Sequence, residues 1–206
     1  MVVLHYTAMP TCNDARARLC DPQTEVSAHY LISEHGEVLA LVPEELRAWH
    51  AGAGAWGAVS DVNSRSIGIE LANSGAAPFP ERQMAALEAV LADVMHRWHI
   101  PEQRVIGHSD MAPGRKGDPG ARFDWRRLAL AGMAVWPDAL TDEPGADSFQ
   151  DAARQFGYPD GPIDQILAAF RLRFRPWAKG PLDAVDSAMA RNLACRFPVD
   201  AAPRGA

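Results

Sequence analysis

Two histidines and one aspartate stand at, or shortly after, the ends of short apolar runs. His5 closes the run that begins at Val2, His108 follows Val105-Ile106-Gly107, and Asp118 comes ten residues after His108. Two imidazoles and one carboxylate, with a fourth position left for water, are the ligand set of a catalytic zinc site. A lone histidine at a strand end is more often structural, so the zinc hypothesis needs a second signal.

That signal comes from a lysine. Of the 20 basic residues only Lys116 and Lys179 are Lys, and the rest are Arg. Lys116 lies two residues before Asp118 in a stretch rich in Gly and Pro. Alternate residues of an extended segment point to the same side. We therefore expect Lys116 and Asp118 to face one site.

An acid inside an apolar strand is the third candidate. Glu70 lies in the run Ile67-Gly68-Ile69-Glu70-Leu71. A charge buried without a partner is costly, so an acid in this run favours a functional role over that of an ordinary inward acid.

The elements that must position these residues alternate between strands and helices. The expected strands cover residues 2–6, 27–33, 37–42, 66–71 and 104–107, and the expected helices cover 12–20 and 80–99. Thr11 is the expected cap of the first helix. A hairpin turn at Glu34-His35-Gly36 joins the second and third strands, with Gly where a positive φ is needed. Strands intermixed with helices predict an α/β fold with a mixed central sheet flanked by helices.

A change of composition divides the chain. Residues 136–147 are rich in Pro, Asp, Glu and Gly, which is typical of a linker. Beyond them, residues 149–156, 163–174 and 182–193 predict three helices. We expect two domains, a catalytic one over 1–146 and a small three-helix one over 147–206.

Composition excludes several classes of protein. The formal net charge of −6 argues against sequence-independent nucleic-acid binding. No apolar run reaches the length of a membrane span. Three cysteines, an odd number, make no disulfide framework. The start of the sequence has no signal-peptide pattern, so we expect a cytoplasmic protein, or a periplasmic one if its N-terminus has been trimmed. A monomer is expected.

Six segments together resemble a known family. In order they are Leu4-His5-Tyr6-Thr7-Ala8, Ser27-Ala28-His29-Tyr30, Trp49-His50-Ala51-Gly52, Ser66-Ile67-Gly68-Ile69-Glu70-Leu71, Gly107-His108-Ser109-Asp110 and Lys116-Gly117-Asp118-Pro119-Gly120. This set is similar to the zinc-dependent N-acetylmuramoyl-L-alanine amidases of the type 2 family. The resemblance spans residues 2 to about 130.

The resemblance implies roles for the matching residues. His5, His108 and Asp118 would be the zinc ligands. Glu70 would be the general base or a carboxylate that orients the water; as base it would take a proton from water and return it to the leaving amine. Lys116 would face the negative charge that develops on the carbonyl oxygen. The bond cleaved would join the lactyl group of N-acetylmuramic acid to L-alanine.

Three further residues are weaker candidates for substrate binding. His50 would be either a wall of the substrate cleft or a structural hydrogen-bonding residue. Arg65 and Asn73 flank the strand that carries Glu70, and they would bind amides and carboxylates of the stem peptide. For Arg65, a solvated surface position is the alternative.

One departure from the family pattern selects a branch. Phage and peptidoglycan-recognition members have a catalytic Tyr before the histidine of the second segment, where this chain has Ala28. A base at Glu70 matches the recycling branch, so we expect action on soluble 1,6-anhydro-muropeptides. The alternatives are a periplasmic amidase acting on intact peptidoglycan and a muropeptide-binding module without activity. A zinc peptidase is disfavoured because His-Glu-x-x-His is missing.

The C-terminal part carries a second resemblance. Ala169-Phe170-Arg171 followed by Phe174-Arg175-Pro176 resembles the signature of peptidoglycan-binding three-helix domains, with Arg171 in place of the usual Gln. The helices would then either bind glycan or pack against the catalytic domain and shape its cleft.

Overall fold

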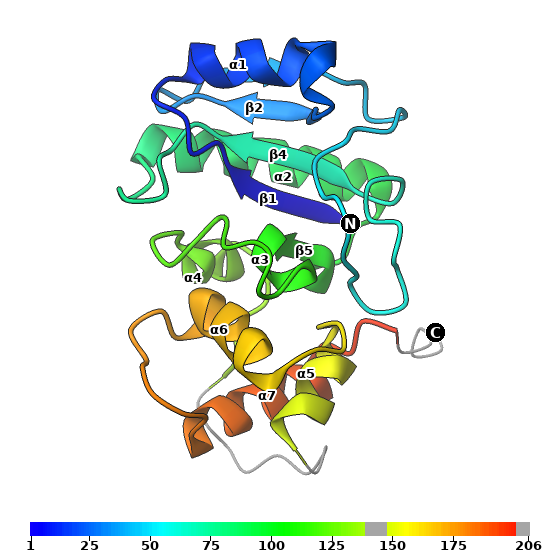
Figure 1. Ribbon diagram of the computed structural model, residues 1–206, viewed down its shortest axis with the longest axis vertical. Helices are drawn as coiled ribbons and strands as arrows, with labels where there is room; N and C mark the ends of the chain where they lie inside the picture. Colours follow the sequence, from blue (N-terminus) through cyan, green and yellow to red (C-terminus); the bar gives the residue numbers. More distant parts are fainter. Residues whose placement is uncertain (139–147, 201–206) are drawn as a thin grey trace.

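The computed structural model describes residues 1–138 and 148–200, which form a five-stranded mixed sheet with helices around it (Figure 1). The strand order is β3-β2-β4-β1-β5. The strands are β1 (Val2–Tyr6), β2 (Tyr30–Ile32), β3 (Val38–Ala40), β4 (Ile67–Leu71) and β5 (Val105–Gly107). All neighbouring pairs are parallel except the β2–β3 hairpin at the edge. The prediction of a mixed central sheet flanked by helices is confirmed.

Alternation along β1 and β4 gives the sheet two different faces. Leu4 and Ile69 belong to the core that lies under α2 (Glu81–Trp98), the long helix behind the sheet in Figure 1. Successive strand residues point to opposite faces, so His5 and Glu70 lie on the face that α2 does not cover. The sequence expectation for this helix, residues 80–99, is confirmed to within a residue at each end.

Local sequence explains the hairpin and the first helix. Gly36 has a φ of +86°, and a Cβ there would lie 2.7 Å from the Arg82 carbonyl oxygen. The turn therefore requires glycine, as predicted. The Thr11 hydroxyl accepts a hydrogen bond of 3.1 Å from the Asp14 amide and so caps α1 (Cys12–Cys20), also as predicted.

The remaining helices are short or C-terminal. They are the 3₁₀ turns η1 (Pro22–Thr24) and η2 (Glu102–Arg104), and the helices α3 (His108–Met111), α4 (Trp125–Leu130), α5 (Phe149–Phe156), α6 (Ile163–Phe174) and α7 (Ala184–Arg196). The bounds predicted for α5 and α6 are those observed, and α7 begins two residues and ends three residues later than predicted. Helices α3 and α4 were not anticipated.

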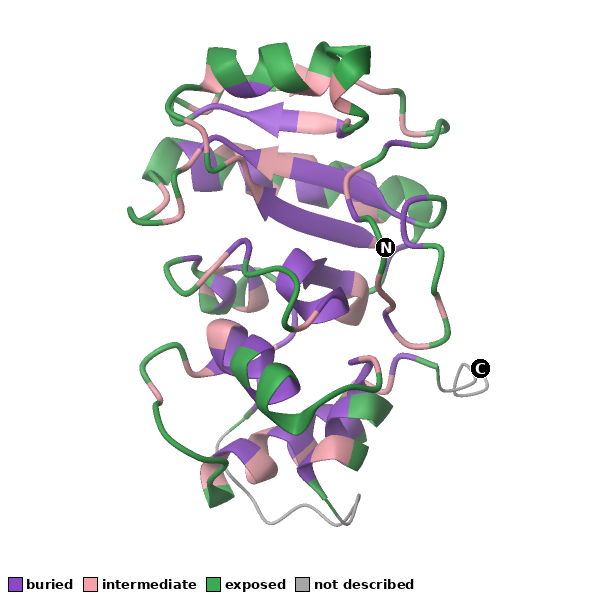
Figure 2. Ribbon diagram, in the orientation of Figure 1, coloured by how far each residue is buried: buried purple, intermediate pink, exposed green. Residues whose placement is uncertain are grey.

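The C-terminal helices stack beyond the β5 edge of the sheet (Figure 1) and share a core with it. One cluster of buried apolar residues contains Val3 and Ile106 of the sheet together with Phe156 of α5 and Phe170 of α6. Figure 2 shows this buried zone running from the strands into the helices below them. The predicted domain boundary near 146, and residues 139–147 of the expected linker, lie outside the described residues.

Candidate metal centre

Three side chains predicted as metal ligands converge on one point. His5 is the fourth residue of β1, His108 is the first residue of α3, and Asp118 lies on the following loop. The two Nδ1 atoms are 3.0 Å apart, and Asp118 Oδ2 lies 2.9 Å from His5 Nδ1 and 3.1 Å from His108 Nδ1. In the part of the chain that the structure describes, they are the one cluster of three His, Cys or acidic groups with this geometry.

Hydrogen bonds on the far side of each ring fix the tautomers of the two histidines. His108 Nε2 lies 2.7 Å from the Ala51 carbonyl oxygen, which can only accept, so Nε2 carries the proton. His5 Nε2 lies 3.0 Å from His50 Nδ1, and His50 Nε2 lies 3.2 Å from the Ser66 hydroxyl. Ser66 donates to the Val62 carbonyl oxygen at 2.5 Å. The rings of His5, His50 and His108 therefore all donate from Nε2.

It follows that both ligand candidates present Nδ1 lone pairs to each other and to a carboxylate oxygen. Three electron-rich atoms about 3 Å apart need a cation or a proton between them. Burial, followed by the neighbouring His108, lowers the pKa of His5 to about 4, so His5 does not keep an added proton at neutral pH. Two imidazole nitrogens and one carboxylate oxygen fit a divalent metal such as zinc.

Asp118 is held in place by its backbone as well as by its carboxylate. Its carbonyl oxygen accepts from the Ser109 amide at 2.9 Å, which ties the loop to α3. Burial alone would raise the pKa of Asp118, but contacts with His108 and His5 outweigh burial and hold it below the ordinary value. The carboxyl group is therefore ionised at neutral pH.

His50 depends on a glycine in the neighbouring strand. A Cβ on Gly68 of β4 would lie 2.3 Å from His50 Cγ, so only glycine leaves room for the ring. The Asn63 side chain accepts from the amides of His50 and Ala51 at 3.0 and 2.8 Å and shapes this segment. Burial lowers the pKa of His50 well below its ordinary value, which keeps it neutral. His50 is both a cleft wall and a hydrogen-bond partner of His5, so the structure unites the two predicted alternatives.

Glu70 lies next to the ligands with an unsatisfied oxygen. It is the register partner of His5 on the adjacent parallel strand, so both side chains point to the same face. Burial, reinforced by the negative charge of Asp118 and opposed by Lys116, raises the pKa of Glu70 to about 8. Among the described residues, Glu70 Oε2 is buried with no hydrogen-bond partner. A carboxyl group in this state can carry a proton near neutral pH.

These residues line one open cleft of about 400 Å³. His5, His50, Glu70, His108, Lys116 and Asp118 all contribute to its wall. The structure therefore brings together the predicted ligands, the predicted base, the predicted cation and one of the three weaker candidates. Trp49, Val26 and Leu19 also line an adjoining hollow of about 580 Å³, which extends the cleft along α1.

The structure does not bring Arg65 to this cleft. Arg65 is exposed two residues before β4 begins, whereas Glu70 is near its end. It borders a different hollow, next to Met1 and Glu44. The predicted contact between Arg65 and substrate is thus not supported, and the solvated alternative fits its position.

Asn73 also has a different task. Its side-chain oxygen accepts from the Gly75 amide at 2.8 Å, and its side-chain nitrogen donates to the Pro78 carbonyl oxygen at 3.4 Å. Asn73 therefore folds its own loop and is not among the residues that line the cleft.

Two residues at the site were not identified from the sequence. Arg115 donates to the carbonyl oxygens of Ala51 and Ala53, and so holds the segment that accepts the His108 hydrogen bond. Its position beside Lys116 was the available signal. Ser66 accepts from His50 in the series of hydrogen bonds that begins at His5; it belongs to one of the six family-like segments, but no role was predicted for it.

Comparison with known proteins gives matches along most of the chain. Residues 1–121 match the family model described as N-acetylmuramoyl-L-alanine amidase. N-acetylmuramoyl-L-alanine amidase AmiD of Escherichia coli K12 is 36% identical over 235 residues, covering 97% of this chain and 84% of the relative. The 1,6-anhydro-N-acetylmuramyl-L-alanine amidase AmpD of Enterobacter cloacae is 42% identical over 103 residues, covering 50% and 55%.

Solved structures extend the likeness to the C-terminal helices. The E. coli AmiD complex with the substrate anhydro-N-acetylmuramic acid-L-Ala-D-γ-Glu-L-Lys has a TM-score of 0.87 at 33% identity, covering 96% of this chain and 89% of that one. AmpDh3 from Pseudomonas aeruginosa in complex with anhydromuramic pentapeptide has a TM-score of 0.85 at 32% identity, covering 96% and 92%. In both cases the matched fold includes the sheet and the helices that follow it.

Proposed function

Because the chain belongs to the N-acetylmuramoyl-L-alanine amidase family, we propose that it uses zinc to cleave the amide between N-acetylmuramic acid and L-alanine in soluble 1,6-anhydro-muropeptides. The observation that carries the proposal is the convergence of His5, His108 and Asp118 beside the unpartnered carboxyl group of Glu70. Relatives named as 1,6-anhydro amidases, and solved relatives that contain anhydro-muropeptides, support this class of substrate.

The metal would be held by His5 Nδ1, His108 Nδ1 and Asp118 Oδ2. A zinc ion bound there would supply an activated water and a Lewis acid for the amide carbonyl. The hydrogen bonds from His5 to His50 and from His108 to the Ala51 carbonyl oxygen orient the rings and keep their Nδ1 atoms free of protons.

Glu70 carries the proton in this proposal. The carboxylate takes a proton from the attacking water and delivers it to the nitrogen of the departing L-alanine. Its buried setting supports this role, because a raised pKa lets the same group accept and release a proton near neutral pH. Lys116 lines the cleft, and its ammonium group would stabilise the negative charge that grows on the carbonyl oxygen.

The setting follows from the substrate. We place the protein in peptidoglycan recycling, in which a cytoplasmic enzyme acts on soluble fragments. In residues 1–138 and 148–200, no helix has both the length and the apolar character needed to cross a bilayer. A periplasmic enzyme that acts on intact sacculi is the alternative, and substrate preference separates the two.

In the test, the zinc-loaded full chain is incubated in parallel with anhydro-muropeptide and with intact sacculi. The products are identified by mass spectrometry. Release of free stem peptide mainly from the soluble substrate supports the recycling role, while equal release from sacculi favours the periplasmic alternative. The Asp118→Ala variant should release no stem peptide from either substrate. Asp93 is an exposed acid on α2, and the Asp93→Ala control should behave as the wild type. If the zinc-loaded wild type releases no stem peptide from either substrate, the result would favour a muropeptide-binding module without activity.

A further inference from the structure

Helix α3, which begins with the ligand candidate His108, is tied to the C-terminal helices through Asp110. This carboxylate is completely buried and receives three hydrogen bonds. Its Oδ2 accepts from the Gly107 amide at 2.8 Å and from Arg173 Nη1 at 2.8 Å. Its Oδ1 accepts from the Tyr158 hydroxyl at 2.6 Å. Two of the three donors therefore come from the C-terminal part of the chain.

These bonds act on both sides of His108. Gly107 immediately precedes the histidine, and Asp110 follows it by two residues, so the carboxylate closes the turn from β5 into α3 around the ligand. The Ser109 amide in the same turn holds the carbonyl oxygen of Asp118 at 2.9 Å. A movement of this turn would shift two of the three metal-binding groups together.

Arg173 is buried within this junction. Its side chain is almost fully buried, its Nη2 donates to the Val105 carbonyl oxygen at 3.2 Å, and its guanidinium stacks 4.2 Å from the centre of the Trp125 ring. A buried guanidinium needs its carboxylate partner, because an unpaired charge in the interior is strongly destabilising. Arg173 and Asp110 therefore fix each other's position.

We infer that Tyr158 and Arg173 are positioning residues for the metal ligand His108, acting through Asp110. The C-terminal helices then complete the metal centre, whatever else they bind. This inference rests on the metal site of the proposed function. Metal sites are sensitive to such support because ligand distances must hold to about 0.2 Å, and outer partners of ligands commonly change metal affinity about 10- to 100-fold.

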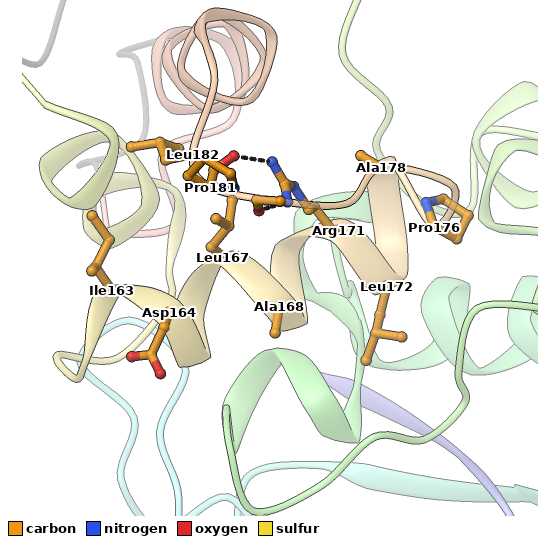
Figure 3. Close-up of a pocket in the computed structure, with 11 residues that line it drawn as sticks. Ile163, Asp164, Leu167, Ala168, Arg171, Leu172, Pro176, Ala178, Pro181 and Leu182 are labelled. Carbon is orange, nitrogen blue, oxygen red and sulfur yellow. Dashed lines mark hydrogen bonds between the residues drawn. The ribbon is translucent and has the colours of Figure 1, made fainter.

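The same helix offers a matched control. Arg171 lies two residues before Arg173 on α6 and also forms a buried pair with an aspartate, Asp186 of α7, at 2.5 Å. Figure 3 shows its guanidinium turned toward the loop at Pro181, and it donates to the Gly180 and Pro181 carbonyl oxygens at 2.7 and 2.9 Å. All of these partners belong to the C-terminal helices and their loop, so Arg171 shares the chemistry of Arg173 without its link to α3.

The experiment compares Tyr158→Phe, Arg173→Met and Arg171→Met in the full-length chain. Zinc affinity is measured by competition with a chromogenic chelator, ligand geometry by the visible absorption of the cobalt-loaded proteins, and stability by thermal unfolding. We expect zinc affinity to fall about threefold to tenfold in Tyr158→Phe and about 10- to 100-fold in Arg173→Met. Both should change the cobalt spectrum. Arg171→Met should keep zinc affinity within about twofold and leave the spectrum unchanged while losing thermal stability.

Two results would overturn the inference while leaving the proposed function standing. One is an unchanged affinity and spectrum in both Tyr158→Phe and Arg173→Met. The other is an equal loss of affinity in Arg171→Met and Arg173→Met, because the helices would then act only through general stability. Tyr158→Phe keeps the ring and removes one hydroxyl, so it remains informative even if Arg173→Met does not fold. A wild type that binds no zinc would instead refute the proposed function, and this inference with it.

Discussion

His5 and Glu70 are register partners on the parallel strands β1 and β4. The pairing puts the imidazole of a candidate metal ligand and the carboxyl group of the proposed base on the same face of the sheet, side by side. Because β5 is the other neighbour of β1, the residue that follows β5, His108, arrives at the same edge. Three parallel strands therefore assemble the site at their carboxyl ends, where ligands commonly bind to such sheets.

Replacing Glu70 should separate metal binding from turnover. Glu70→Gln keeps the size of the side chain but cannot take up a proton. We expect the zinc content to stay the same and kcat on anhydro-muropeptide to fall about 100-fold or more. Metal analysis and steady-state kinetics measure the two effects, with the exposed Glu37→Gln as control. A kcat close to that of the wild type would show that Glu70 is not the general base.

The buried carboxyl group should also make the stability of the metal-free protein depend on pH. Burial raises the pKa of Glu70 from 4.5 to about 8, so between these values the folded state holds a proton that the unfolded state has released. Stability falls with rising pH wherever the folded state binds more protons. The contribution of Glu70 to stability is thus greatest below pH 4.5 and is lost as the pH rises through about 8.

The measurement for this prediction is urea unfolding of metal-free protein at pH 5.5 and 8.5, for the wild type and for Glu70→Gln. The wild type should lose stability relative to the variant on going to the higher pH, because Gln has no proton to release. A constant difference in unfolding free energy between the two proteins would show that Glu70 titrates normally.

Much of this arrangement was predictable from local patterns. The apolar runs placed His5 and His108 at strand ends, and helical periodicity gave the bounds of α2, α5 and α6 closely. Arg65 shows where such patterns fail. It is only five residues from Glu70 in sequence, but it lies two residues before β4 begins, whereas Glu70 is near the end of that strand, and an extended strand rises about 3.3 Å per residue.

Contacts between distant segments had no local signal at all. The partners Asp110 and Arg173 are 63 residues apart, and the Ala51 carbonyl oxygen that fixes the His108 tautomer is 57 residues from that ring. For Asn73 the signal was local but of another kind, since its side chain bonds within its own loop, to the Gly75 amide and the Pro78 carbonyl oxygen. Sequence patterns identified the side chains that converge at the candidate metal centre but not the groups that orient them.

Removing the His50 ring should weaken metal binding without touching a ligand. His50→Ala deletes the acceptor for His5 Nε2 and so frees the ring of His5 to rotate or change tautomer. We expect zinc affinity to fall about 10- to 100-fold. Ser66 is the next hydrogen-bond partner beyond His50, so Ser66→Ala should lower zinc affinity less. His96→Ala, an exposed histidine on α2, is the control. Unchanged affinity in His50→Ala would show that His5 needs no such partner.

Gly68→Ala should act on the metal through the same ring. The added methyl group would lie 2.3 Å from His50 Cγ, so the ring must move away from His5. We expect a loss of about 1–3 kcal/mol in stability from overpacking, and a fall in zinc affinity comparable to that of His50→Ala. Gly161→Ala, where a Cβ meets nothing within 4 Å, is the matched control. In a His50→Ala background the clash has gone, so adding Gly68→Ala should change zinc affinity little. Fully additive losses in this double-mutant cycle would mean that Gly68 supports the site by another route.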